Sequence, residues 1–196
     1  MIAEPASALY SHPMTDAERA RIQTLSLVAV LLLIGLAAQI LYPYYRPVWA
    51  TAGLFAVFTV LIWYDFRNMI LPDPITLPLI AAGLGWTIWS GGSLTVAIIG
   101  GAVGYLLVRL INVIWQARSG MDGMGLGDGK LLAAAGTWLG AFGLPATILI
   151  GSGTALLLVL LSGGGRAPNR HKRIAFGPFI ALGFWACWVF PIVPVI

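Results

Sequence analysis

Outside its polar first 24 residues the chain has four carboxylates, and two of them, Asp65 and Asp128, adjoin long apolar runs. Ionisable residues at membrane depth are costly, so they are functional candidates. Two neighbouring carboxyl groups can share the work of hydrolysis, because the ionised one activates a water while the protonated one donates to the carbonyl of the breaking bond. Asp65 and Asp128 are therefore predicted to form a hydrolytic pair that needs no metal, histidine or nucleophilic serine.

Alternating glycines surround the second aspartate, in residues 123–130. Glycine lets a backbone approach another chain closely, so we expect Gly125 and Gly127 to let an extended peptide lie beside the Asp128 carboxylate. A glycine-rich loop before a helix can also bind phosphate, and Lys130 would suit that role. A nucleotide site is not predicted, because the Walker A spacing and a preceding strand are absent and an acid stands where the anion would bind.

Each aspartate of the pair also has a structural interpretation. Asp128 can cap a helix that begins at Gly129 or Lys130, and Asp65 can mark the end of a span beside Arg67. The occurrence of two such residues, each in a distinctive local motif, favours the catalytic interpretation.

The other two aspartates are predicted to be structural. Asp73 lies between Pro72 and Pro74, where Pro74 suits the first position of a helix and Asp73 its N-cap. Asp122 lies in a glycine-containing segment and is expected to be a solvated loop residue.

The composition excludes an ordinary soluble globule. Of the 196 residues, 59% are hydrophobic and only 9% are charged, whereas an average soluble domain has roughly 25% charged residues. The single cysteine, Cys187, excludes a disulfide within the chain and a zinc site of paired CxxC motifs, and the scattered His12 and His171 cannot replace them. We predict no cofactor and no metal, the lipid bilayer as a partner and no binding to nucleic acid, and we leave the oligomeric state open.

Seven apolar runs are candidate membrane helices, since a span needs roughly 20 residues. They cover residues 25–42, 48–64, 75–89, 94–115, 131–144, 146–161 and 174–196. The third and fifth runs are short, so a buried or re-entrant segment is an alternative for each. In the fourth run, Gly100, Gly101 and Gly104 are expected to pack against another helix. The sequence predicts an all-α polytopic membrane protein, with a cytosolic tail at residues 1–24 and one transmembrane domain at residues 25–196.

Basic residues set the predicted orientation, because short loops rich in Lys and Arg stay in the cytosol. With the N-terminus in the cytosol and seven spans, all but one of the 11 basic residues lie on or near the cytosolic side, and the exception is Arg46. Arg109, near the end of the fourth run, is expected to reach the headgroups by snorkelling. The four aspartates beyond residue 24 also fall on the cytosolic side.

The segments around the two aspartates resemble the motifs of type IV prepilin peptidases. Residues 64–73, Tyr-Asp-Phe-Arg-Asn-Met-Ile-Leu-Pro-Asp, resemble the first aspartate motif of that family. Residues 124–134, which contain Gly-Leu-Gly-Asp-Gly-Lys-Leu, resemble the second, and residues 176–179, Phe-Gly-Pro-Phe, are similar to the segment that opens the last helix.

The resemblance implies a bacterial inner-membrane aspartyl protease that removes the short basic leader of type IV prepilins or pseudopilins at the cytosolic face. It implies that Asp65 and Asp128 are the catalytic pair. Bifunctional members of the family also carry a segment with paired CxxC motifs, associated with methylation, so this chain is expected to be a short form without it. Four further residues are expected to contact the substrate: Gly125, Gly127, Gly177 and Pro178.

Two alternatives stay open at this point. Presenilin-type intramembrane proteases also combine Tyr-Asp with Gly-Leu-Gly-Asp, although the small size of this chain and the Leu-Pro-Asp and Gly-Asp-Gly-Lys-Leu contexts stand against them. An ion-coupled transporter also places two acids in the membrane, and uptake into proteoliposomes without peptide cleavage would identify one.

Overall fold

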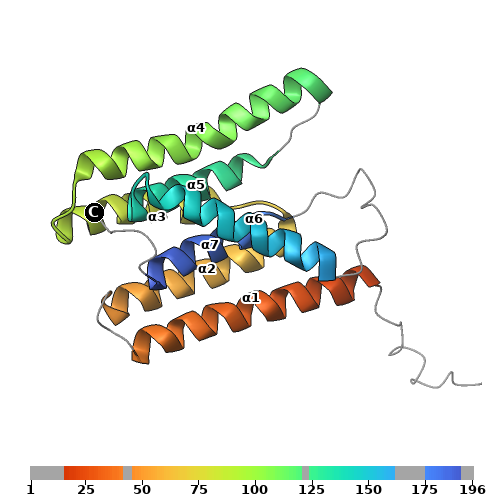
Figure 1. Ribbon diagram of the computed structural model, residues 1–196, viewed down its shortest axis with the longest axis horizontal. Coiled ribbons are helices and arrows are strands. Elements are labelled where there is room, and N and C mark those ends of the chain that lie inside the picture. The colour runs from red at the N-terminus through yellow and green to blue at the C-terminus, as the bar shows by residue number, and fades with distance from the viewer. Residues whose placement is uncertain (1–15, 42–45, 121–123, 162–174, 191–196) are drawn as a thin grey trace, which may run out of the picture.

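The computed structural model describes residues 16–41, 46–120, 124–161 and 175–190, and the regular structure within these ranges is helical throughout. This confirms the all-α prediction for the described part of the chain. Figure 1 shows the helices in chain order: α1 Asp16–Leu41, α2 Val48–Asn68, α3 Asp73–Trp89, α4 Leu94–Ser119, α5 Leu126–Leu139, α6 Gly143–Leu161 and α7 Gly177–Val189.

Helices α5 and α7 form the centre of the bundle. Nearly every residue is buried at 128–139 in α5 and at 177–189 in α7. A helix that is apolar on all sides can bury every face, which suits these two segments to the interior. The other helices surround them, since α3 and α4 pack against α5, whereas α1, α2 and α6 pack against α7. In Figure 1, α4 and α1 lie on opposite sides of this centre.

Glycines allow α4 and α5 to pack with their backbones in direct contact. A Cβ atom on Gly136 would collide with the carbonyl oxygen of Gly100, and one on Gly104 would collide with that of Leu132. A Cβ atom on Gly101 would likewise lie 2.8 Å from the Thr137 side chain. The prediction that the glycines of α4 serve helix packing is confirmed.

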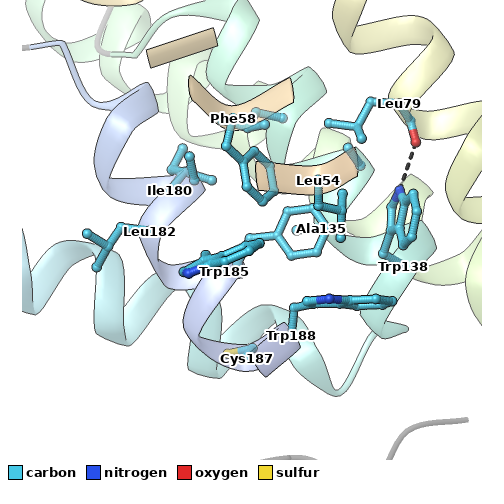
Figure 2. Packing of buried hydrophobic residues seen from close by; sticks show 14 of the residues in the cluster. Leu54, Phe58, Leu79, Ala135, Trp138, Ile180, Leu182, Trp185, Cys187 and Trp188 are labelled. Carbon is cyan, nitrogen blue, oxygen red and sulfur yellow. Dashed lines mark hydrogen bonds between the residues drawn. The ribbon is translucent and has the colours of Figure 1, made fainter. Parts of the chain in front are cut away.

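Aromatic side chains fill the core between α2, α5 and α7 (Figure 2). Phe58 of α2 meets Phe184 and Trp185 of α7 edge to face, with ring centroids 5.0 and 6.1 Å apart. Trp138 of α5 donates a 2.8 Å hydrogen bond from its indole nitrogen to the carbonyl oxygen of Leu79 in α3. The rings therefore combine a large buried apolar area with specific orientation, which holds the two central helices against their neighbours.

Several helix boundaries differ from those predicted from hydropathy, and two of them bear on the predicted tail and on the candidate site. Helix α1 begins at Asp16 rather than at residue 25, so it extends into the predicted tail. Helix α5 begins at Leu126 rather than at residue 131, so Asp128 lies inside the helix instead of before it. An apolar run marks only the apolar part of a helix, whereas backbone hydrogen bonding continues through polar residues with good helix propensity and through glycines packed against a neighbour.

Among the described helices, three are long and apolar enough, by length and composition alone, to cross a membrane: α2, α4 and α6. The apolar part of α1, Val28–Leu41, is shorter, and α5 and α7 have only 14 and 13 residues. Helix length therefore supports fewer spans than the seven predicted from the apolar runs.

The two ends of the bundle differ in chemistry. Helix α2 ends and helices α3 and α5 begin at one end, which we call the acidic end because it carries Asp65, Asp73 and Asp128. The other end has a cluster of indole rings with centroids 5.2 to 6.0 Å apart, and we call it the tryptophan end. Its members are Trp49, Trp86, Trp89, Trp138 and Trp188.

Candidate active site

Asp65 lies in the last turn of α2, where Met69 ends the helix in a left-handed conformation with φ of 52°. Asp65 is only 5% exposed, and its Oδ2 atom has no hydrogen-bond partner among the described residues. Arg67, the expected neighbour, instead lies over the Trp63 ring at 5.3 Å. A buried carboxylate oxygen without a partner is destabilising, so its presence marks Asp65 as a functional candidate.

Asp128 lies in the first turn of α5 and is 8% exposed. The residue that precedes the helix is Gly125, and α5 has no side-chain capping hydrogen bond at its start. Asp128 is thus the third residue of α5 and not the N-cap of a helix beginning at Gly129 or Lys130.

The fold brings Asp65 and Asp128 together from distant parts of the chain, close enough for their charges to interact. Each carboxylate lies against a glycine. A Cβ atom on Gly177 would be 2.7 Å from Oδ2 of Asp65, and one on Gly125 would be 3.2 Å from Oδ2 of Asp128. The missing side chains thus let the backbone of α7, and of the segment before α5, lie directly beside the two carboxylates.

Leu71 packs between the start of α5, which carries Asp128, and the start of α7, which lies against Asp65. A Cβ atom on Gly127 would be 2.9 Å from Cβ of Leu71, and one on Gly177 would be 3.2 Å from its Cδ1 atom. Gly127 therefore accommodates Leu71, which is 6% exposed. Pro178 follows Gly177 in the first turn of α7 and is buried. Of the four expected substrate-contact residues, Gly125 and Gly177 lie beside a carboxylate.

Asn112 of α4 is a further residue of this region, and sequence reasoning assigned it no role. It is buried, and its side-chain amide makes two hydrogen bonds with the backbone of Met124, directly before Gly125. A polar amide within an apolar run is a signal that could have identified it, because such a group needs partners inside the protein.

The predicted capping role of Asp73 is wrong. Asp73 is the first residue of α3, Pro72 occupies the N-cap position, and no side chain caps this helix. The carboxylate instead forms an ion pair with Lys130 of α5, where the Asp73 side chain is 54% exposed and that of Lys130 is 26% exposed. Lys130 gives Asp73 a charged partner on the neighbouring helix. Their ion pair links the starts of α3 and α5 next to the two buried aspartates.

In the described ranges, no group of three or more His, Cys, Asp or Glu side chains is placed to hold a metal ion. Asp122, His12 and His171 lie outside the described residues.

Comparison with known proteins gives consistent results. The model of the type IV leader peptidase family matches residues 52–160. A "Prepilin leader peptidase/N-methyltransferase" from Pectobacterium carotovorum subsp. carotovorum is 36% identical over 156 residues, which are 79% of this chain and 56% of that protein. One of the same description from Aeromonas hydrophila is 35% identical over 174 residues, 85% of this chain and 57% of that protein. The chain thus spans a little more than half the length of these relatives. No solved structure matches it at a significant level.

Proposed function

The chain belongs to the type IV leader peptidase family, and from this premise we propose that it is an aspartyl endopeptidase that removes the leader peptide of type IV prepilins or pseudopilins. The matched relatives are described as both leader peptidases and N-methyltransferases, and this chain aligns with only part of them. The proposal therefore concerns the peptidase activity alone. Family membership also sets aside the presenilin-type alternative.

The observation that carries the proposal is that two buried carboxylates, Asp65 and Asp128, lie at the acidic end near enough for their charges to interact. Like charges in a desolvated site favour a state in which the two groups share one proton. In that state the ionised carboxylate can take a proton from a water, while the protonated carboxyl group donates to the peptide carbonyl that the water attacks. The pair then acts as base and acid without any further group.

The glycines beside the pair support a peptide substrate. Gly125 and Gly177 keep side-chain atoms away from the two carboxylates, so an extended backbone can approach both acids. We assign substrate contact to these two residues and a supporting role in the substrate site to their neighbours Gly127 and Pro178. Of the two neighbours, Gly127 acts through its packing on Leu71 and Pro178 by starting α7 beside Asp65.

We also propose that residues 25–196 form one domain that crosses the bacterial inner membrane seven times, with the N-terminus in the cytosol. The large apolar side chains exposed along α4 support contact with lipid, for example Leu106 at 60% and Leu110 at 56% exposure. The short helices α5 and α7 are enclosed by the others, so their ends can lie in protein instead of headgroups. Lys130 and Arg118 lie towards the acidic end, which favours placing that end, and the catalytic pair, in the cytosol.

A cleavage assay on the purified protein tests the proposal. The protein in detergent is incubated with a prepilin-type peptide, a short basic leader followed by an apolar segment, and mass spectrometry locates the cut. One cut at the end of the leader is expected, and it should disappear in Asp65→Asn and in Asp128→Asn. Ion uptake into proteoliposomes without any peptide cleavage would instead identify the chain as an ion-coupled transporter.

A further inference from the structure

A buried arginine lies at the tryptophan end, far from the two catalytic candidates. Arg46 stands just before α2 and is 7% exposed. Its backbone carbonyl accepts a 2.7 Å hydrogen bond from the side-chain amide of Gln39, which is itself buried in the last turn of α1. Its guanidinium carbon lies 4.3 Å from the ring centroid of Trp188 and 5.9 Å from that of Trp86. The side chain is therefore held inside the protein among α1, α2, α3 and α7.

The charge of Arg46 has no negative partner in the described part of the chain. The ion pair found there joins Lys130 to Asp73. The aspartates lie at the acidic end, and the length of α2 places Asp65 about 28 Å along the helix from Arg46, at a rise of about 1.5 Å per residue. Burial lowers the pKa of Arg46 to about 10. A cation so placed is destabilising unless an anion accompanies it.

Two hydrogen-bond donors at this place lack an acceptor. Within the described ranges, Nη2 of Arg46 and the indole nitrogen of Trp86 are both buried and have no hydrogen-bond partner. Buried donors in folded proteins are nearly always paired. The indole nitrogen of Trp138, in the same cluster and labelled in Figure 2, follows that rule by donating to Leu79. Arg46 and Trp86 are neighbours, with the guanidinium carbon 5.9 Å from the Trp86 ring centroid, and together they offer one positive charge and two N–H donors that lack an acceptor among the described residues.

We propose that Arg46 and Trp86 form a binding site for a phosphate-type oxyanion at the tryptophan end of the bundle. A guanidinium group presents its donors in a fork that matches phosphate oxygens, and the contact is charge-assisted. Trp49 and Trp89 of the same cluster are 63% and 66% exposed. Indole rings gather at the headgroup level of membranes, where phospholipid phosphates lie, so a lipid headgroup and a free phosphate are the two sources of this chemistry.

Three variants and one matched control test the site. Arg46→Gln removes the charge, Arg46→Lys keeps the charge but loses the fork, and Trp86→Phe removes the indole donor while keeping an aromatic ring. Arg109→Gln makes the same change of charge at an exposed position of α4 and serves as the control. Should Arg46→Gln fail to fold, Arg46→Lys and Trp86→Phe carry the test.

The delipidated protein in a non-ionic detergent is titrated with phosphatidylglycerol, phosphatidylethanolamine, diacylglycerol or inorganic phosphate. Binding is followed by native mass spectrometry and by tryptophan fluorescence. We expect one bound phospholipid of either kind and none of diacylglycerol, which lacks the phosphate. The affinity should fall about tenfold or more in Arg46→Gln, by a smaller factor in Trp86→Phe, and not at all in Arg109→Gln.

Binding of inorganic phosphate as tightly as phospholipid, with the same loss in Arg46→Gln, would support the oxyanion site with a free anion as its occupant. Absence of any phosphate-dependent binding, or an equal loss of affinity in Arg46→Gln and Arg109→Gln, would overturn the proposal. Neither result depends on peptide cleavage, so the site is tested separately from the proposed peptidase activity.

Discussion

Asn112 of α4 holds the backbone of Met124 with two hydrogen bonds. Its side-chain nitrogen donates to the Met124 carbonyl at 2.7 Å, and its side-chain oxygen accepts from the Met124 N–H at 2.6 Å. Met124 directly precedes Gly125, which borders the Asp128 carboxylate. The position of Asp128 relative to Asp65 therefore depends on a residue of another helix that touches neither carboxylate.

Asn112→Leu should lower kcat for leader cleavage by about 10- to 100-fold, because a displacement of about 1 Å at a reacting group can cost about 100-fold. KM should change little, since Asn112 does not reach the substrate. Asn112→Asp keeps the acceptor for the Met124 N–H but places a carboxylate oxygen against the Met124 carbonyl oxygen, so it should also lower kcat. Steady-state cleavage and melting temperature are measured together. An unchanged kcat in a folded Asn112→Leu protein would contradict this positioning role.

Asp65→Asn and Asp128→Asn should each reduce cleavage by at least about 100-fold, because each removes one member of the acid–base pair. Each variant should be at least as stable as the wild type, because Asn has nearly the same shape as Asp and does not place a charge in the protein interior. Asp73→Asn, an isosteric change at the exposed aspartate of the same end, is the control and should stay active. Substantial cleavage by either single variant of the buried pair would reject the assignment.

Asp73→Asn and Asp73→Ala should destabilise the protein equally and by less than about 1 kcal/mol, because both remove the exposed ion pair with Lys130. The loss should shrink as salt is added. A capping role would give a different order, with Ala about 1 kcal/mol worse than Asn. A double-mutant cycle with Lys130→Gln measures the interaction. A coupling energy of zero at low salt would show that the pair contributes nothing.

Gly177→Ala should reduce cleavage more than Gly125→Ala, because the added methyl group would be 2.7 Å from the Asp65 carboxylate in the first case and 3.2 Å from that of Asp128 in the second. Gly85→Ala is the matched control. A Cβ atom there meets nothing within 4 Å in α3, and alanine favours helix by up to about 1 kcal/mol. Activity and melting temperature are compared for the three variants. Equal activity of Gly177→Ala and Gly85→Ala would exclude a tight fit beside Asp65.

Local signals predicted the helices and drew attention to the two aspartates of the candidate site, and they assigned part of its surroundings wrongly. Hydropathy predicted the helices, and the two aspartate motifs predicted which carboxylates belong together. The proline beside Asp73 suggested a cap, but the ion pair with Lys130 depends on how α3 meets α5. The start of α5 was placed too late because glycines and charges interrupt the apolar pattern while the helix continues.

The sequence by itself determined that the chain is helical and rich in apolar surface, and that Asp65 and Asp128 adjoin apolar helices, because these properties follow from neighbouring residues. Only the tertiary structure decided which helices are enclosed, that Asn112 holds Met124, and that Arg46 is buried among tryptophans with its Nη2 atom lacking an acceptor among the described residues. Helices that are apolar on nearly every face carry no periodicity to indicate their partners. Their arrangement depends on the fit of glycines and large rings from distant segments, which only the packed bundle brings together.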